Sequence, residues 1–173
     1  RDLLSRSIAR LSSGSRAVTA SDDPAGISLS EKLSAQNLRV NAASNNVQNA
    51  VSYVQSVDGF LNGMGDLLGR MSELAILAKD PMKNAGDIAL YQQEFSQLQT
   101  QIRNTIGGDT TDIGGLYNIT KPFGSFNGQV LFGANPSGKV IATGQAATQR
   151  LTIPETNLRD GAMLSIFQQN GAG

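Results

Sequence analysis

The apolar positions in the first half of the chain predict one unusually long helix. Asp23-Pro24 is a strong helix start, because Asp accepts a hydrogen bond from a free backbone N–H group and Pro fits the first helical position. No break signal follows before Asp80-Pro81, and a helix over residues 24–79 would be roughly 80 Å long at 1.5 Å per residue. Its second half carries a coiled-coil-like seam at spacings of three and four residues: Val47, Val51, Val54, Val57, Leu61, Met64, Leu68, Met71 and Ala75.

A second helix is predicted from about residue 87 to 106. Asn84 or Asp87 caps its start, and Gly107-Gly108 ends it. The connection between the two helices is short, so we expect them to be antiparallel neighbours. The seam of the second helix again has spacings of three and four: Ile88, Tyr91, Phe95, Leu98, Ile102 and Ile106.

The chain begins with a shorter amphipathic helix. Residues 2–12 place Leu4, Ile8 and Leu11 on one face, and Gly14 is suited to the left-handed residue that ends a helix. There is no initiator Met, and Arg1 already lies in this helical pattern. We therefore expect the chain to be a piece of a longer protein.

The pattern changes after residue 107. Residues 108–125 form a loop rich in Gly, Thr and Asp, and short apolar runs separated by Gly, Pro and Asn follow it. These runs predict strands at residues 129–132, 139–143, 150–153 and 163–167. The expected fold class is mainly α: a long antiparallel helical rod, resembling a coiled-coil bundle, with a small C-terminal β-hairpin region. The expected domains are residues 1–22, 23–107 and 108–173.

The long helix is poor in charge, which changes how its surface is interpreted. Only 16% of the chain is charged, and Asp58 and Asp66 are the only charged residues between Val40 and Leu68, whereas about a quarter of residues are charged in a typical protein. Within this stretch, Asn, Gln, Ser and Gly occupy most of the positions outside the apolar seam. We favour an outer face covered by other copies of the chain, with mid-helix glycines allowing close packing. The alternatives are a weakly charged exposed helix and, for the glycines, a local kink.

Composition argues against an enzyme. The chain has no Cys and no His, which removes thiolate nucleophiles, imidazole bases and the usual zinc ligands. No nucleophile–base pair is evident, and no cofactor is expected. Asp22-Asp23 is better explained by helix capping than by a cation site, because further oxygen ligands are not evident at suitable spacings. Net charge is zero with no basic block, and no apolar run reaches the length of a membrane span, so nucleic acid and membrane insertion are not expected.

Several separated motifs resemble one protein family. The run RLSSG at residues 10–14, followed by Arg16, Asp22-Asp23, Ala25-Gly26 and Lys32, resembles the N-terminal pattern of bacterial flagellin. Further on, ELA at residues 73–75 and FNG at residues 126–128 resemble the family's later motifs in the same order. The stretch 108–125 is longer than the family's usual link before FNG, and the part after Gly133 matches poorly.

The resemblance implies a structural subunit of the flagellar filament. Such a subunit is extracellular, is exported unfolded by the flagellar type III apparatus and polymerises with other flagellin subunits, with an export chaperone and junction proteins as further partners. Residues 1–22 would be the end of the N-terminal helix and the spoke linker, residues 23–107 the N-terminal half of the rod, and residues 108–173 the extended loop and β-hairpin region. Without the family's terminal helices, this chain alone is not expected to polymerise.

The resemblance also implies one set of interaction residues, and a second set is suggested by position alone. Arg70, Glu73, Leu74 and Glu94 match the surface that the flagellin-sensing Toll-like receptor recognises, although Ser72 stands where the family has a basic residue. The structural alternative is that Leu74 is a core residue and Arg70 a solvated cation.

The basic residues that flank the turn before the long helix form the second set. We hypothesise that Arg10 and Arg16 contact carboxylates of another copy, such as Asp22 and Asp23.

Two other functions remain open at this point. A hook–filament junction protein shares the N-terminal pattern but does not propagate a filament. A cell-surface adhesin or glycan-binding relative would use the loop and β part, where Tyr117, Phe123 and Phe126 are the available aromatic side chains.

Overall fold

The computed structural model describes residues 2–14, 23–109, 117–133, 138–144, 146 and 148–159. The chain divides into two compact units, one formed by residues 1–47 and 142–150 and the other by residues 48–141 and 151–173. The described part is mainly helical with two small antiparallel sheets, which confirms the predicted fold class. The strand predicted at residues 163–167 lies outside the described residues, as do parts of the loop predicted at residues 108–125.

Helix α1 (Asp2–Ser13) and the first part of helix α2 (Pro24–Leu77) belong to the first unit. Gly14 follows α1 with φ of +65°, so it ends the helix in the left-handed conformation that the sequence predicted. Asp23 caps α2: its Oδ1 accepts a hydrogen bond of 2.9 Å from the Gly26 backbone N–H. The capping interpretation of Asp23 is therefore confirmed. The α2 helix runs for 54 residues without interruption, so its glycines introduce no break.

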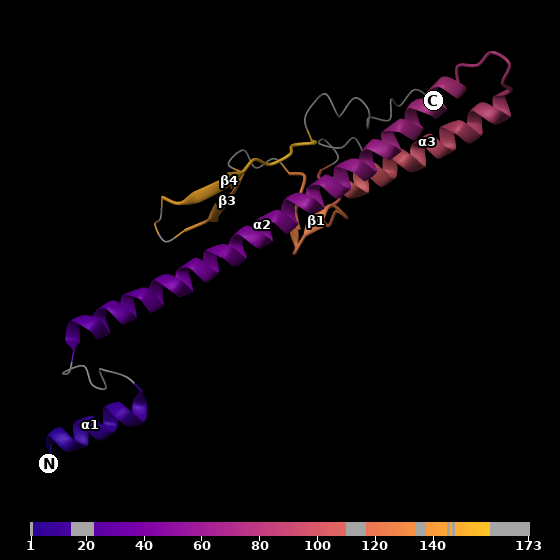
Figure 1. Cartoon of the computed structure of the whole chain (residues 1–173). Coiled ribbons are helices and arrows are strands. Elements are labelled where there is room, and N and C mark those ends of the chain that lie inside the picture. Colours follow the sequence, from indigo (N-terminus) through magenta and orange to yellow (C-terminus); the bar gives the residue numbers. More distant parts are fainter. Residues whose placement is uncertain are drawn as a thin grey trace. The chain divides into compact units, whose positions relative to one another are not determined.

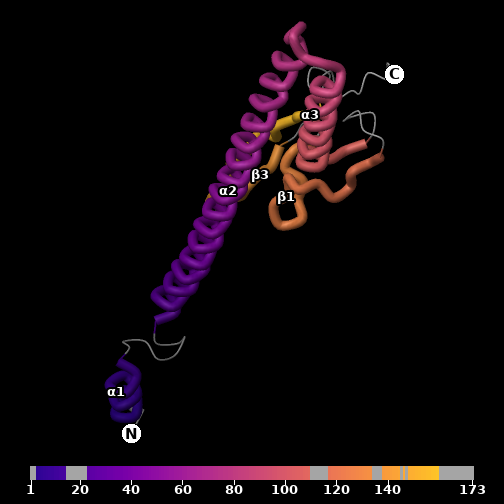
Figure 2. Tube along the Cα trace, turned by 90° about the vertical axis from the view of Figure 1, so that its right-hand side faces the viewer, coloured from indigo at the N-terminus to yellow at the C-terminus, as the bar shows by residue number. Residues whose placement is uncertain are grey.

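Helix α3 (Ala85–Ile106) runs back along the C-terminal part of α2, as Figures 1 and 2 both show. Asn84 is its N-cap in a capping box: the Asn84 side chain accepts from the Asp87 N–H, and the Asp87 carboxylate accepts from the Asn84 N–H. Gly107 ends α3 with φ of +67°, and an added Cβ there would lie 2.7 Å from Cβ of Pro122. Both ends of α3 are thus fixed by residues that the sequence identified.

The core of the second unit joins α2, α3 and the segment after them. Ile102 and Ile106 of α3 and Leu131 and Phe132 of the later segment are completely buried. The Phe60 and Phe132 rings meet edge to face with centroids 6.3 Å apart, a favoured aromatic arrangement. The other buried members of this cluster come from α2: Tyr53, Met64 and Met71.

The seam predicted on α2 is correct at Met64 and Met71 but wrong toward both of its ends. Met64 and Met71 are buried as predicted, but Val51 and Val54 are about half exposed. Ala50 and Tyr53, one residue earlier along the helix, are buried instead. Both rows have spacings of three and four, so periodicity alone does not choose between them. Ala75 is likewise exposed, whereas its neighbour Leu74 is buried.

The β part consists of two hairpin-like pairs. Strands β1 (Ser125–Phe126) and β2 (Gln129–Val130) are antiparallel, with Phe126 opposite Gln129. Phe126 packs edge to face on Tyr53 at 6.0 Å, which attaches this hairpin to α2. Strands β3 (Lys139–Ala142) and β4 (Arg150–Ile153) form the second sheet. The strand predicted at residues 129–132 is shorter in the structure: β2 ends at Val130, although the Leu131 N–H still donates to the Gly124 carbonyl at 3.0 Å, and the Leu131 and Phe132 side chains lie in the core.

The segment before the first hairpin is tied to the end of α3. Gly108 and Ile119 exchange two backbone hydrogen bonds of 2.9 and 2.8 Å. Arg159 Nη2 donates to the Ile106 carbonyl at 3.1 Å, placing a cation at the C-terminal end of α3, where the helix dipole favours positive charge. These contacts belong to the second unit and keep its loop segments close to the α3 terminus.

Candidate interaction surfaces

Arg70 joins α2 to α3 on the surface of the second unit. Its Nε and Nη2 atoms donate to the two carboxylate oxygens of Glu94 at 2.7 and 3.1 Å. Its Nη1 atom donates to Glu73 Oε2 at 2.7 Å, one helical turn along α2. The fork of the guanidinium thus pairs with Glu94 in the bidentate geometry that Arg favours with carboxylates. We call Arg70, Glu73 and Glu94 the Arg70 cluster.

The pairing of Arg70 with Glu94 shifts the pKa of both groups toward their charged forms. The hydrogen bond from Arg70 lowers the pKa of Glu94 below its ordinary value of 4.5. The hydrogen bonds to Glu94 and Glu73 raise the pKa of Arg70. The side chains of Arg70 and Glu94 are 43% and 41% exposed, so water and salt screen the pair and its contribution to stability is small. The cluster presents fixed, oriented charges to solvent.

Leu74 is placed differently from its proposed partners on the receptor surface. It is only 1% exposed, so its side chain lies in the helical core rather than on the surface. It lines a small pocket between α2 and α3 together with Tyr91 and Phe95. The heptad row that buries Met71 also buries Leu74. Its burial agrees with the alternative that Leu74 is a core residue, and the exposed members of the proposed receptor set are the Arg70 cluster.

The residues proposed for contacts between copies are only partly described. Arg10 is exposed in the last turn of α1, and Asp23 caps α2. Arg16 and Asp22 lie outside the described residues, so the structure does not test whether the four residues approach one another.

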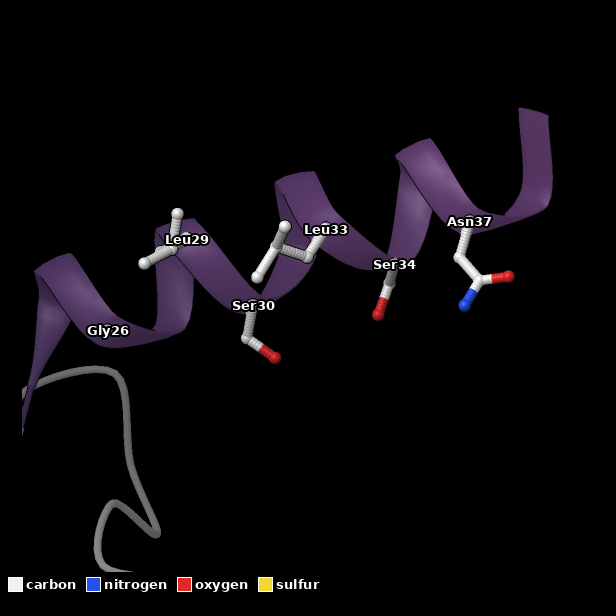
Figure 3. A pocket seen from close by; sticks show the side chains of 6 residues that line it. All are labelled: Gly26, Leu29, Ser30, Leu33, Ser34 and Asn37. Carbon is white, nitrogen blue, oxygen red and sulfur yellow. The ribbon is translucent and has the colours of Figure 1, made fainter. Parts of the chain in front are cut away.

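An exposed apolar row begins α2. Leu29 and Leu33 are separated by one helical turn and are 58% and 55% exposed. They line a shallow open pocket with Gly26, Ser30, Ser34 and Asn37, all from α2 itself (Figure 3). We call Leu29 and Leu33 the leucine row. The sequence-based interpretation did not single it out, although a leucine pair four residues apart at a helix start is a usable signal.

The outer side of α2 in the second unit is open as well. A Cβ added at Gly59, Gly63, Gly65 or Gly69 would meet no atom within 4 Å. Close packing within the described chain therefore does not explain these glycines. Val51 and Val54 are also exposed on this helix. Apolar residues with few charges are characteristic of surfaces that pack against another chain.

The described residues hold no obvious chemical site. No group of three or more acidic, His or Cys side chains is placed to hold a metal ion among residues 2–14, 23–109, 117–133, 138–144, 146 and 148–159. In that same described part, no helix combines the length and hydrophobicity that crossing a membrane requires. The structural features that stand out are surfaces rather than cavities.

Comparison with known proteins decides the family. The sequence profile of the bacterial flagellin N-terminal helical region matches residues 1–117, well over half of the chain. The chain belongs to the bacterial flagellin family. The RLSSG, Asp22-Asp23 and ELA motifs all lie within the matched region, so the resemblance seen in the sequence is confirmed.

Individual relatives extend the similarity into the β part. A flagellar filament 30.7 kDa core protein of Treponema maltophilum is 31% identical over 177 aligned positions, which cover 99% of this chain and 61% of the relative. A flagellin of Clostridium tyrobutyricum is 33% identical over 85% of this chain and 35% of its own length. Flagellin A of Vibrio cholerae is 30% identical over 82% of this chain and 36% of its own length. The chain thus spans between about a third and three fifths of these flagellins.

Proposed function

We propose that this chain is part of a structural subunit of the bacterial flagellar filament, which polymerises outside the cell and has no catalytic role. Family membership supports a filament role, and the leucine row is the observation on this chain that carries the proposal. Exposed Leu29 and Leu33 lie at the start of a 54-residue helix whose first turn is capped and ordered. A regular helix with exposed leucines one turn apart on the same face is suited to packing that face against another part of an assembly.

Assembly of the full-length parent protein tests this proposal. Leu33→Asp places a charge in the leucine row, and we expect it to abolish or strongly reduce filament formation seen by electron microscopy after seeding. The matched control is Glu31→Gln, because a residue two positions away lies on nearly the opposite side of the helix. The control should polymerise normally. Normal filaments from Leu33→Asp would contradict the proposal.

We further propose that the domains follow the family's architecture. Residues 1–22 would be the end of the N-terminal helix and the spoke linker, residues 23–107 the N-terminal half of the rod, and residues 108–173 the loop and hairpin region. The capped start at Asp23 and the end of α3 at Gly107 support the two boundaries. Limited proteolysis tests them: cleavage should concentrate outside residues 23–107 and spare α2 and α3.

Contacts with other partners are narrower proposals. The Arg70 cluster is a candidate surface for the flagellin-sensing Toll-like receptor, supported by its exposed charges and its position on α2 and α3. Glu94→Lys should reduce receptor activation by the full-length protein, whereas Lys79→Ala, elsewhere on the surface, should not. An unchanged response to Glu94→Lys would exclude this surface.

The remaining partners concern export and assembly. We propose that an export chaperone and junction proteins bind the full-length subunit, and that Arg10 and Arg16 contact Asp22 or Asp23 of another copy. A charge reversal at Arg16 that leaves filament assembly and stability unchanged would rule out the contact between copies.

A further inference from the structure

We propose that Asn127 is a site of spontaneous deamidation, a covalent change in the turn between β1 and β2 that is independent of filament assembly. Asn127 and Gly128 are the two residues of this turn, since Phe126 and Gln129 pair directly with each other. Both turn residues are exposed and have positive φ angles, 49° and 76°. This is the geometry of a tight two-residue hairpin turn, which Asn-Gly favours.

The chemistry needs only the protein and water. The backbone nitrogen of Gly128 attacks Cγ of Asn127 and forms a new bond to it, and the Cγ–Nδ2 bond of the Asn127 amide breaks. The departing amino group leaves as ammonia with the proton from the Gly128 amide, and a five-membered succinimide ring remains. Water then opens the ring at either carbonyl to give Asp or isoaspartate at position 127. The balance is one water consumed and one ammonia released, with no oxidant or reductant.

No neighbouring atom obstructs the two reacting groups in this turn. Gly128 has no side chain to obstruct its backbone nitrogen, and an added Cβ would meet nothing within 4 Å, so the turn lies in open space. Among the described residues, no hydrogen bond engages the Asn127 side-chain amide or the Gly128 N–H. Neither reacting group must therefore be released from a partner before attack.

The same dipeptide occurs a second time in a protected setting. Asn62-Gly63 lies inside α2, and the Asn62 side chain donates to Asp58 Oδ2 at 3.3 Å. The α-helix engages the Gly63 N–H with the carbonyl four residues earlier and fixes the backbone dihedral angles. Attack at Asn62 therefore requires local opening of the helix. The comparison separates the effect of the fold from the effect of the dipeptide.

The two products differ in their effect on the hairpin. Asp at position 127 preserves a turn that Asp-Gly also favours. Isoaspartate instead routes the backbone through the side chain and adds one carbon to the turn. The Phe126–Gln129 pairing then loses its register, and Phe126 is drawn away from Tyr53. Formation of isoaspartate is expected to loosen the hairpin from α2.

Peptide mapping of the full chain tests the proposal. The folded protein is incubated at mildly alkaline pH, digested at intervals and analysed by fragmentation mass spectrometry, which locates each converted Asn. We expect Asn127 to convert at least about tenfold faster than Asn62, because Asn62 can react only while the helix around it is locally open. In urea the two rates should converge. Equal rates in the folded protein, or slower conversion at Asn127, would overturn the proposal. Asn170-Gly171, which lies outside the described residues, is distinguished by its own peptide.

Hydrogen exchange of the products tests the consequence. The isoaspartate form should exchange the backbone amide of Leu131, which donates to the Gly124 carbonyl across the hairpin at 3.0 Å, at least several-fold faster than the unmodified protein. Asn127→Asp is the matched control, because it adds the same charge without lengthening the backbone, and its exchange should stay close to that of the unmodified protein. Equal exchange in the isoaspartate form and in Asn127→Asp would refute the proposed loosening.

Discussion

The two units of the chain use similar amphipathic helices with opposite results. In the second unit, apolar residues at spacings of three and four are covered by α3 and by the segment around Phe132. In the first unit, Leu11 of α1 and Leu33 of α2 are 83% and 55% exposed. Amphipathic periodicity therefore marks a face that needs a partner, but it does not say whether the same stretch of chain supplies one. For a filament-forming family, the uncovered face is the informative one.

Substitution in the buried core should have the largest effect on stability. Ile102→Ala removes a completely buried side chain of α3 and should lower the free energy of unfolding by about 2–5 kcal/mol. Leu90→Ala on the same helix is the control, because Leu90 is 65% exposed, and it should stay within about 0.5 kcal/mol. Urea denaturation followed by circular dichroism measures both. Equal losses would mean that α3 is not anchored through its C-terminal half.

Removing a helix cap should have a smaller effect on stability, and the effect should differ between the two units. Asn84→Ala removes both hydrogen bonds of the α3 capping box and should lower the free energy of unfolding by about 0.5–2 kcal/mol. Asp23→Ala removes the cap of α2, where little core surrounds the first turn, and should chiefly accelerate hydrogen exchange at the amides of residues 25–27. A global loss of stability from Asp23→Ala would show that the first turn of α2 is coupled to the core.

The leucine row should contribute little to the stability of the chain alone. Leu33→Ala is expected to change the free energy of unfolding by less than about 0.5 kcal/mol, because the side chain is already exposed. The same substitution in the full-length parent should reduce the thermal stability of assembled filaments, where we propose that this row is covered. Calorimetry on both forms makes the comparison. A substantial loss in the chain alone would show that Leu33 is buried there.

The Arg70 cluster should give the smallest effect, and one that depends on pH. The pKa of Glu94 is lowered in the folded state, so the stabilisation by its pairing with Arg70 is present above pH 4.5 and is lost as the pH falls through the lowered value. A carboxyl titration by NMR should show this lowered pKa, and Arg70→Gln should return it toward 4.5. High salt should weaken the shift, because the pair is exposed. A Glu94 pKa unaffected by Arg70→Gln would disprove the pairing in solution.

Much of the helical fold could be predicted because its signals are local. Asp23-Pro24, Asn84 and Gly107 act through backbone geometry and hydrogen bonds within a few residues, and each marks a helix boundary in the structure. The burial of Met64 and Met71 also follows from periodicity. The strand at residues 150–153 was predicted with the bounds that β4 shows.

The sequence-based prediction of burial on α2 was wrong where residues far along the chain determine which side chains are covered. Two neighbouring rows on α2 satisfy the same spacing, and the edge-to-face contact of Tyr53 with Phe126, far along the chain, favours the Tyr53 row. The burial of Leu74 likewise depends on distant residues of α3, and it agrees with the alternative that Leu74 is a core residue. For the candidate surfaces, the sequence identified Arg70, Glu73 and Glu94 by resemblance, whereas the leucine row needed the structure, because exposure depends on what covers a residue.

The sequence by itself determined the class of fold, the helix boundaries and the family, because caps, periodicity and ordered motifs are encoded within short stretches. Only the tertiary structure decided which row of α2 is buried, how the guanidinium of Arg70 pairs with Glu94, and that the Asn127 turn is open while the Asn62 dipeptide is held in a helix. Each of these depends on distances between residues far apart in the chain or on a local backbone conformation. Identical residue types, including the two Asn-Gly pairs among the described residues, therefore have different exposure and different expected chemistry.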